Sequence, residues 1–135
     1  MNEITLNEFK NSDQYEEFIN NNPEVGYLNI RAYAANSAIP ITDLEVKVSK
    51  TIDNQKVLFF DGRTDQSGLI SNISLPAPAV NSNDEVIPLS SEYEVSARYN
   101  GNNLIFTVVM YAGISVLQNI SVVPNLRLDG GIYGR

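Results

Sequence analysis

The sequence contains neither cysteine nor histidine. Without cysteine, the chain has no disulfide framework, no thiolate metal site and no thiol nucleophile. Without histidine, it has no histidine-based catalytic triad, no histidine-rich zinc site and no side chain that ordinarily titrates near neutral pH. These two absences remove the commonest catalytic and zinc-binding groups. We therefore expect a protein that is not an enzyme, with no catalytic residue, no cofactor and no metal ion.

Long apolar runs and clusters of basic residues are missing too. The longest apolar run, Leu104 to Ala112 with Thr107 inside it, is too short to span a bilayer. The first eight residues lack the basic region and the apolar stretch of a secretion signal. Nucleic-acid binding by counterion release needs a basic face, and none is present. We expect a soluble protein with no signal peptide, no membrane span and no nucleic-acid partner.

The length and composition of the chain suit a single domain. It has 135 residues, of which 43% are hydrophobic, enough to bury a core without disulfides or metals. The net charge is −7, and five of these net negative charges fall in residues 1–24, where six acidic side chains accompany Lys10. Charge runs of this kind are usually solvated, so we expect the acidic start to face water.

From Gly26 onward, apolar and polar residues alternate with the period of half-buried strands. Turn signals separate the strands. The most prominent is Thr64–Gly68, where we expect a hairpin turn with Gly68 at positive φ, and Asn100-Gly101 is the strongest short hairpin signal. No helical pattern intervenes, which favours an all-β antiparallel sandwich. The seven predicted strands are 26–33, 44–49, 56–61, 68–75, 93–99, 103–111 and 115–123, with a long loop from Pro76 to Ser91.

The N-terminal segment has a different pattern. Ile4 and Leu6 alternate with polar residues in a short extended segment that ends at Phe9. After it, Asp13 and Glu16 have the spacing of a capping box, and the apolar spacing of the following residues predicts a helix over 13–20. The predicted organisation is an arm over 1–25, the sandwich over 26–125 and a tail over 126–135. Gly130-Gly131 would make this tail flexible enough to add contacts in an assembly.

Several motifs, taken in order, resemble a transthyretin-like (prealbumin-like) β-sandwich over about residues 15–125. They are Gly26–Ile30, Pro40–Val48, Thr64–Gly68, Leu75–Pro78 and Tyr93–Val95. Among relatives of this kind, the chain resembles the transthyretin-like domains of clostridial spore cortex-lytic enzymes and small single-domain proteins related to them. The enzyme of this superfamily, hydroxyisourate hydrolase, needs active-site histidines and a C-terminal Tyr-Arg-Gly-Ser. This chain lacks histidine and ends Ile132-Tyr133-Gly134-Arg135, so the resemblance implies no hydrolase activity.

Three weaker site candidates have simpler structural alternatives. Asp61 and Asp65 could help to hold Ca²⁺, but Asp65 could equally hydrogen-bond the backbone of its own turn. Lys50 has the inward parity that an isopeptide crosslink requires, yet lysine is rarely buried without a partner, so we expect no crosslink. Tyr27 and Tyr33 could stack on sugar rings, or they could pair across strands to stabilise the sheet.

For function, the sequence favours a structural protein that self-associates through its terminal arms, for example in a spore-surface layer or a filamentous appendage. An apolar arm that adds a strand to a neighbouring copy would form a heterologous contact. The alternative arrangement is that the arm folds back on its own domain. The alternative function is a binding or regulatory module that docks on a partner cell-wall hydrolase or on glycan. The predicted assembly residues are Ile4, Leu6, Phe9, Tyr15, Phe18, Ile19 and Tyr133.

Overall fold

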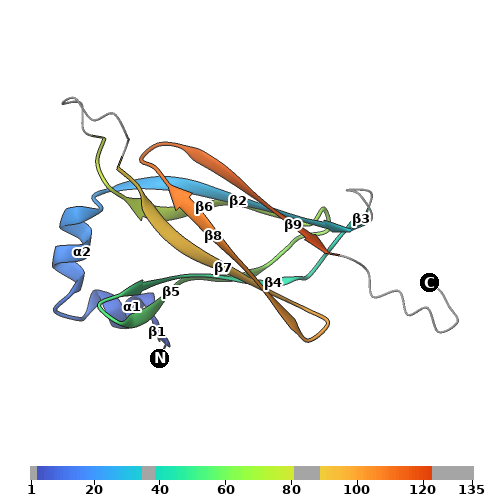
Figure 1. The fold of residues 1–135 in the computed structure, drawn as a ribbon, viewed down its shortest axis with the longest axis horizontal. Coiled ribbons are helices and arrows are strands. Elements are labelled where there is room, and N and C mark those ends of the chain that lie inside the picture. Colours follow the sequence, from blue (N-terminus) through green and yellow to red (C-terminus); the bar gives the residue numbers. More distant parts are fainter. Residues whose placement is uncertain (1–2, 35–38, 81–88, 123–135) are drawn as a thin grey trace, which may run out of the picture.

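The computed structural model of the chain describes residues 3–34, 39–80 and 89–122, which form a sandwich of two sheets (Figure 1). Two short helices, α1 (Leu6–Lys10) and α2 (Tyr15–Asn21), follow the first strand. The described strands are β1 (Glu3–Thr5), β2 (Glu24–Ala34), β3 (Ile39–Pro40), β4 (Glu45–Ile52), β5 (Gln55–Arg63), β6 (Leu69–Ala77), β7 (Ser91–Tyr99), β8 (Asn102–Met110) and β9 (Ser115–Val122).

One sheet has the strand order β1-β5-β4-β7-β8, and the other is built around β2, which pairs with β3, β6 and β9. The seven predicted strands are all present, as β2 and β4 to β9. The prediction of seven antiparallel strands is nevertheless wrong in two respects, because the described residues hold nine strands and the sheets are mixed. β1 runs parallel to β5, and β9 runs parallel to β2. Alternating side chains mark a strand but do not fix the direction of its partner.

The core lies between the two sheets, where the alternating apolar residues point inward. Leu28, Ile30 and Ala32 of β2 are fully buried and face Val46 and Val95 of the other sheet within one cluster. Side chains at the intervening positions point outward, as the period of two requires. No helix in the described parts of the chain has the length and apolar character needed to cross a membrane.

Two turns show where local sequence signals were sufficient to predict the backbone conformation. Asn100 and Gly101 have φ of 51° and 80°, the type I′ geometry that matches the twist of the β7–β8 hairpin, as predicted. Gly68 also has the predicted positive φ, at 76°. The turn that contains it is not a hairpin, however, because β5 belongs to one sheet and β6 to the other. The segment over Thr64–Gly68 therefore connects the two layers.

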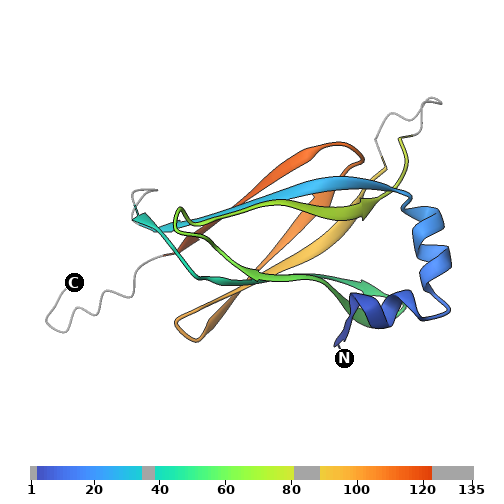
Figure 2. The same ribbon diagram turned by 180° about the vertical axis from the view of Figure 1, so that it is seen from behind.

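The N-terminal arm differs from the prediction in its local structure. Residues Leu6–Lys10 form α1 rather than an extension of the strand. A capping box starts this helix: the Glu8 amide donates to Thr5 Oγ1 at 3.1 Å, and the Thr5 amide donates to Glu8 Oε1 at 2.8 Å. The capping box predicted at Asp13 is absent, since α2 begins after Gln14 with no side-chain cap. Figures 1 and 2 place both helices at one end of the sandwich, away from β3.

Candidate functional site

A hollow of about 240 Å³ lies at the corner where β3 and the Thr64–Gly68 turn meet β2. Its lining comes from three separate parts of the chain: Arg31 and Tyr33 of β2, Pro40 of β3, and Gln66 and Ser67 of the turn. Arg31 and Tyr33 occupy outward positions of β2, because the alternate residues Ile30 and Ala32 are buried in the core. The hollow is therefore on the outer face of the β2 sheet.

Arg31 is a cation in neutral surroundings. Its guanidinium carbon lies 4.4 Å from the centroid of the Tyr33 ring, a distance typical of cation–π stacking. The residues opposite Arg31 on the two neighbouring strands are Leu69 and Asn119, both uncharged. Arg31 forms no ion pair with any residue that the structure describes. Stacking holds the guanidinium plane in place while its N–H groups keep their capacity to donate hydrogen bonds.

Asp65 shapes the turn that carries Gln66 and Ser67. Its Oδ1 accepts hydrogen bonds from the amides of Ser67 at 2.8 Å and Leu69 at 2.9 Å, and its carbonyl accepts from the Gly68 amide at 2.9 Å. These bonds confirm that Asp65 caps its own turn. They do not favour the calcium alternative, and no group of potential metal ligands that includes Asp61 or Asp65 occurs among the described residues.

Gly68 brings the turn into direct contact with β2. The Ala32 amide donates to the Gly68 carbonyl at 2.8 Å. A Cβ atom at position 68 would lie only 2.4 Å from the Ala32 carbonyl oxygen, so no other residue fits without displacing backbone. This close approach places the tip of the turn beside Arg31, the residue that precedes Ala32.

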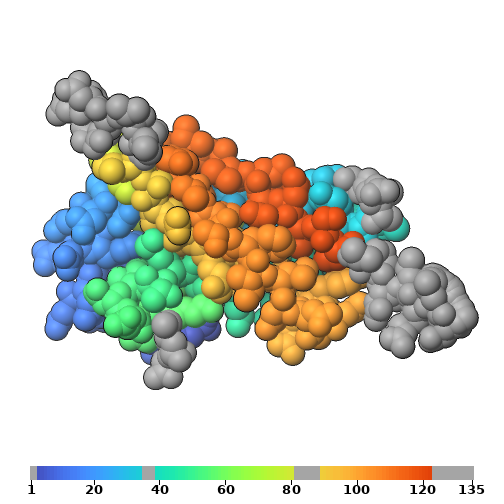
Figure 3. Space-filling view, in the orientation of Figure 1, coloured from blue at the N-terminus to red at the C-terminus, as the bar shows by residue number. Residues whose placement is uncertain are grey.

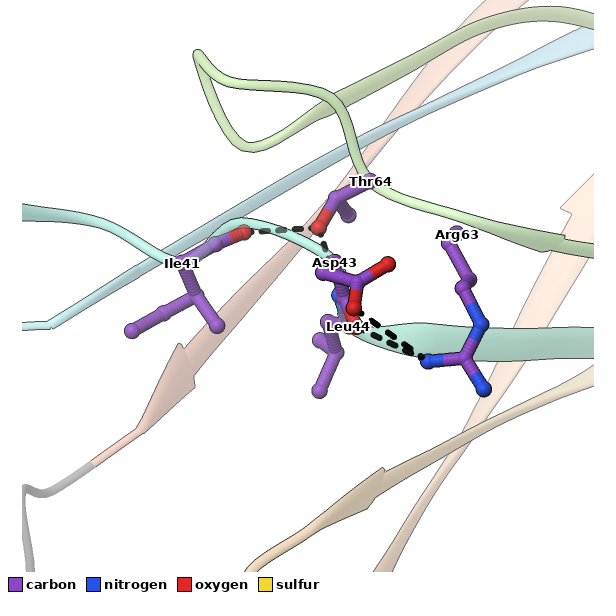
Figure 4. Close-up of polar contacts among 5 residues, drawn as sticks. All are labelled: Ile41, Asp43, Leu44, Arg63 and Thr64. Atoms are coloured by element: carbon purple, nitrogen blue, oxygen red, sulfur yellow. Dashed lines mark hydrogen bonds and ion pairs between the residues drawn. The ribbon is translucent and has the colours of Figure 1, made fainter.

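Thr64 fixes the start of the same turn (Figure 4). Its Oγ1 accepts a hydrogen bond from the Leu44 amide at 2.9 Å and donates one to the Ile41 carbonyl at 2.7 Å. The side chain is buried, and the bond from the Leu44 amide is shielded from water. Arg63 adds a more exposed link, with Nη1 3.1 Å from the Asp43 carbonyl and 3.8 Å from Asp43 Oδ2. The end of β5 is thereby held against the segment between β3 and β4.

The four polar side chains of the hollow are hydrogen-bond donors, and three of them are also acceptors. None of the side chains of Arg31, Tyr33, Gln66 and Ser67 is hydrogen-bonded to another described residue, so their capacity is open to a ligand. No carboxylate lines the hollow. A cation surrounded by neutral donors is suited to hold an anionic group, because each charge-assisted bond is shorter and stronger than a neutral one.

The two tyrosines considered for sugar stacking lie on this same outer face. Tyr27 is opposite Ser74 on β6 and Ser115 on β9. Tyr33 is opposite Pro40 and Ser121 and stacks with Arg31 of its own strand. Neither tyrosine lies opposite another aromatic residue, and the two predicted roles, stacking on sugar rings and a cross-strand contact that stabilises the sheet, both stay predictions. The sequence analysis missed Arg31 and Gln66, although a single charged residue among the outward positions of β2 was a usable signal.

The predicted assembly residues of the arm come together within the same chain. Phe9 and Phe18 are buried at 2% and 6% exposure and form a second apolar cluster with Val57 of β5. The partly buried members of the cluster include Ile4, Leu6, Tyr15 and Ile19. Ring contacts at 5.4 to 5.8 Å link Phe9 to Tyr15 and Phe18, and Phe18 to Phe59.

In this arrangement the arm folds back on its own domain, the alternative that the sequence left open. Ile4 pairs with Val57 where β1 extends the β5 edge, so its backbone is already engaged within the chain. The side chains proposed as connectors thus have a partner in β5 of the same chain, so burying them needs no second copy. A role of these residues in assembly stays a prediction, and Tyr133 lies outside the described residues.

Lys50 also has a partner within the chain. The β4–β7 pairing ends at Ser49 and Glu94, and the Lys50 ammonium group donates to the Glu92 carbonyl at 2.8 Å, just beyond the last paired residue. The same group lies 5.1 Å from the centroid of the Tyr93 ring. Burial lowers the pKa of Lys50, and the nearby Glu92 carboxylate offsets part of this effect. Lys50 extends the hydrogen bonding of β7 where β4 leaves it.

No protein-family model matches the sequence, and no curated protein matches it either. The structure is similar to the solved structure of Klebsiella pneumoniae 5-hydroxyisourate hydrolase, with a TM-score of 0.51 and 12% sequence identity. The similarity covers 74% of this chain and 91% of the hydrolase chain. The chain therefore has a transthyretin-like fold, as its motifs indicated. The link to spore cortex-lytic enzymes stays a prediction.

The prediction that the chain is not an enzyme is contradicted by this comparison, because a solved structure that shares its fold is that of a hydrolase. The absence of histidine had excluded some catalytic groups, but it did not exclude catalysis by other side chains. At 12% identity the likeness shows the fold alone, so it carries no reaction and no residue role over to this chain.

Proposed function

We propose that this chain is a binding module that holds a carboxylate-bearing ligand, such as an acidic sugar, in the hollow beside Arg31. The observation that carries the proposal is the guanidinium of Arg31, which stacks on Tyr33, has no ion pair among the described residues and has uncharged residues opposite it on both neighbouring strands. A planar guanidinium matches a carboxylate in a bidentate arrangement, and stacking on Tyr33 fixes its orientation in advance.

The distribution of charge supports an anionic ligand despite the overall charge of −7. Five of the seven net negative charges lie in residues 1–24. The two arm helices are at the end of the sandwich opposite to β3, as Figures 1 and 2 show. Solvent-exposed charges are screened over about 8–10 Å at physiological ionic strength. The acidic arm therefore has little influence on an anion held at the corner between β3 and the turn.

Neutral groups around the guanidinium supply specificity. The Gln66 amide and the hydroxyls of Tyr33 and Ser67 line the same hollow, and sugar hydroxyls can pair with all three groups. Gln66 and Ser67 lie on a turn fixed by Asp65 and Gly68, so little conformational entropy is lost when a ligand binds.

A matched pair of ligands tests the proposal. N-acetylmuramate and N-acetylglucosamine differ by a carboxylate-bearing lactyl group, and glucuronate and glucose form a second pair. Titration of ¹⁵N-labelled protein should show shifts of the Arg31, Gln66 and Ser67 signals with the acidic member of each pair only. Arg31→Gln should weaken binding about 10- to 100-fold, since charged hydrogen bonds contribute about 1.5–3 kcal/mol.

The matched control is Arg98→Gln, which removes an exposed arginine from the outer face of the other sheet. It lowers the positive charge of the chain by the same amount, so it reports any general electrostatic effect. Equal loss of binding in the two variants, or equal binding of acidic and neutral sugars, would show that the Arg31 hollow is not a carboxylate site.

A further inference from the structure

We propose that a second hollow, where β4 and β7 separate, is a covalent site at which Lys50 forms an imine with a small neutral aldehyde. The two strands pair as far as Ser49 and Glu94, and residues 50–52 of β4 do not pair with residues 91–93 of β7. A hollow of about 260 Å³ lies at this fork. Figure 3 shows the green surface of β4 and β5 beside the yellow surface of β7. The site is separate from that of the proposed function, which lies on the other sheet.

Two contacts with β7 hold the Lys50 side chain at the hollow. Its Nζ donates a hydrogen bond to the Glu92 carbonyl at 2.8 Å and lies 5.1 Å from the centroid of the Tyr93 ring. An ammonium group has three N–H donors, and the bond to Glu92 uses one of them. A neutral amine keeps an N–H for the same carbonyl and still has a free lone pair. Lys50 can therefore lose a proton and remain in place.

The surroundings of Lys50 favour loss of that proton. Burial lowers the pKa of Lys50 below its ordinary value of 10.5, and the Glu92 carboxylate opposes part of this effect. The next acidic residue of β7, Glu94, is paired with Lys56 of β5 at 3.0 Å, and β8 carries no charged residue. Only a neutral amine attacks a carbonyl carbon. At neutral pH, Lys50 therefore has a larger reactive fraction than a lysine with the ordinary pKa.

Ser49 supplies a buried hydroxyl group to the same hollow. The residue is 3% exposed, and its side chain forms no hydrogen bond with any other residue that the structure describes. Buried polar groups nearly always have a hydrogen-bond partner, and an exception calls for an explanation such as a role in binding or catalysis. The Ser49 hydroxyl is therefore suited to bond an oxygen atom of a ligand beside Lys50.

The size and charge of the hollow indicate the class of ligand. Its volume is smaller than the range of about 300–1,000 Å³ found for drug-sized ligands. The carboxylates of Glu92 and Glu94 line it and disfavour an anion, whereas the hydroxyls of Ser49 and Thr107 can pair with a neutral hydroxyl group. A short hydroxyaldehyde has the reactive carbonyl, the neutral charge and the hydroxyl group that these residues suit.

Imine formation needs no oxidant or reductant. The lone pair of Lys50 Nζ forms a bond to the carbonyl carbon, and one amine proton moves to the carbonyl oxygen. The resulting carbinolamine then loses this oxygen as water, together with the second amine proton, and a C=N double bond remains. The Glu92 carboxylate lies near enough to influence the pKa of Lys50, so it is suited to carry protons between nitrogen and oxygen.

Reductive trapping in the full chain tests the proposal, with glycolaldehyde and glyoxylate as matched two-carbon aldehydes. Cyanoborohydride converts an imine into a stable secondary amine, and peptide mass spectrometry compares Lys50 with the other lysines of the chain, Lys10, Lys47 and Lys56. At pH 7, glycolaldehyde should label Lys50 at least about threefold faster than Lys47, and this ratio should fall as the pH approaches 10.5. Glyoxylate, which is anionic, should give a smaller ratio. Labelling of Lys50 no faster than that of Lys47, or a larger ratio with glyoxylate, would overturn the proposal.

Ser49→Ala distinguishes a ligand site from a lysine that is simply half-buried. Loss of the hydroxyl should lower the ratio of Lys50 to Lys47 labelling by about twofold or more, because a bond to the bound aldehyde is lost. The control is Ser96→Ala, which removes a hydroxyl from β7 outside the hollow and should leave the ratio unchanged. An unchanged ratio in Ser49→Ala, or an equal fall in both variants, would show that the hollow does not hold the aldehyde.

Discussion

Thr64→Val removes one oxygen atom from the base of the turn that shapes the candidate site. The valine side chain has nearly the same shape as threonine, but it cannot accept a hydrogen bond from the Leu44 amide or donate one to the Ile41 carbonyl. Thr64 is only 5% exposed, so water cannot easily replace the lost partner. A buried donor left unsatisfied costs about 1–3 kcal/mol, and the lost bond to Ile41 adds about 0.5–1.5 kcal/mol.

We therefore expect Thr64→Val to lower the free energy of unfolding by about 2–4 kcal/mol. For a chain of this size, that corresponds to a fall in the melting temperature of about 6–15 °C. Thr64→Ser is the control, since it keeps the hydroxyl group and loses one methyl group, at about 1 kcal/mol. Calorimetry of the three proteins measures the difference. A valine variant as stable as the parent, or a serine variant as unstable as valine, would refute the role given to the hydroxyl.

Three further predictions concern other parts of the fold. Gly68→Ala should lower the free energy of unfolding by at least about 1–3 kcal/mol and weaken ligand binding, because the residue has positive φ and the new Cβ meets the Ala32 carbonyl. Chemical denaturation measures the first effect, and ligand titration measures the second. Phe9→Ala should cost about 3–5 kcal/mol by leaving a cavity against Val57, as urea unfolding would show. Burial raises the pKa of Tyr93 above its ordinary value of 10.0. The neutral phenol therefore contributes its full stability to the fold below pH 10.0, and this contribution is lost as the pH rises further. Unfolding experiments at alkaline pH should show a smaller loss of stability for Tyr93→Phe than for the parent.

Local chemistry predicted the strands and turns well, because their determinants lie close together in the sequence. Asn100-Gly101 forms its hairpin because two adjacent residues that tolerate positive φ suffice for a type I′ turn. The same reasoning gave the φ of Gly68 but misassigned its turn. Whether the next strand joins the same sheet depends on distant contacts, here the pairing of β6 with β2. The parallel pairing of β9 with β2 was missed for the same reason.

The arm shows a related limit of sequence patterns. The apolar residues around Phe9 and Phe18 predicted a buried surface, and the structure buries both rings. Their partner, Val57, is about 40 to 50 positions away and carried no signal that linked it to the arm. Periodicity identifies an apolar face, but it does not say whether that face packs within the chain or against another copy.

The candidate site was harder to predict than the fold because its residues come from β2, β3 and the connecting turn. Arg31 and Gln66 are 35 positions apart, and neither belongs to a motif with an established chemistry. Their proximity follows from the contact of Gly68 with Ala32, which is visible only when the two sheets are assembled. The turn at Thr64–Gly68 was recognised as a central feature, but its role in forming a hollow required the structure.

The most direct test of the proposed function is isothermal titration of the full chain with N-acetylmuramate and with N-acetylglucosamine, in the parent protein and in Arg31→Gln. We predict that the acidic sugar binds to the parent, that the neutral sugar binds much more weakly, and that Arg31→Gln removes this difference. Retention of the difference in Arg31→Gln, or its absence in the parent, would contradict the assignment of the hollow as a carboxylate-binding site.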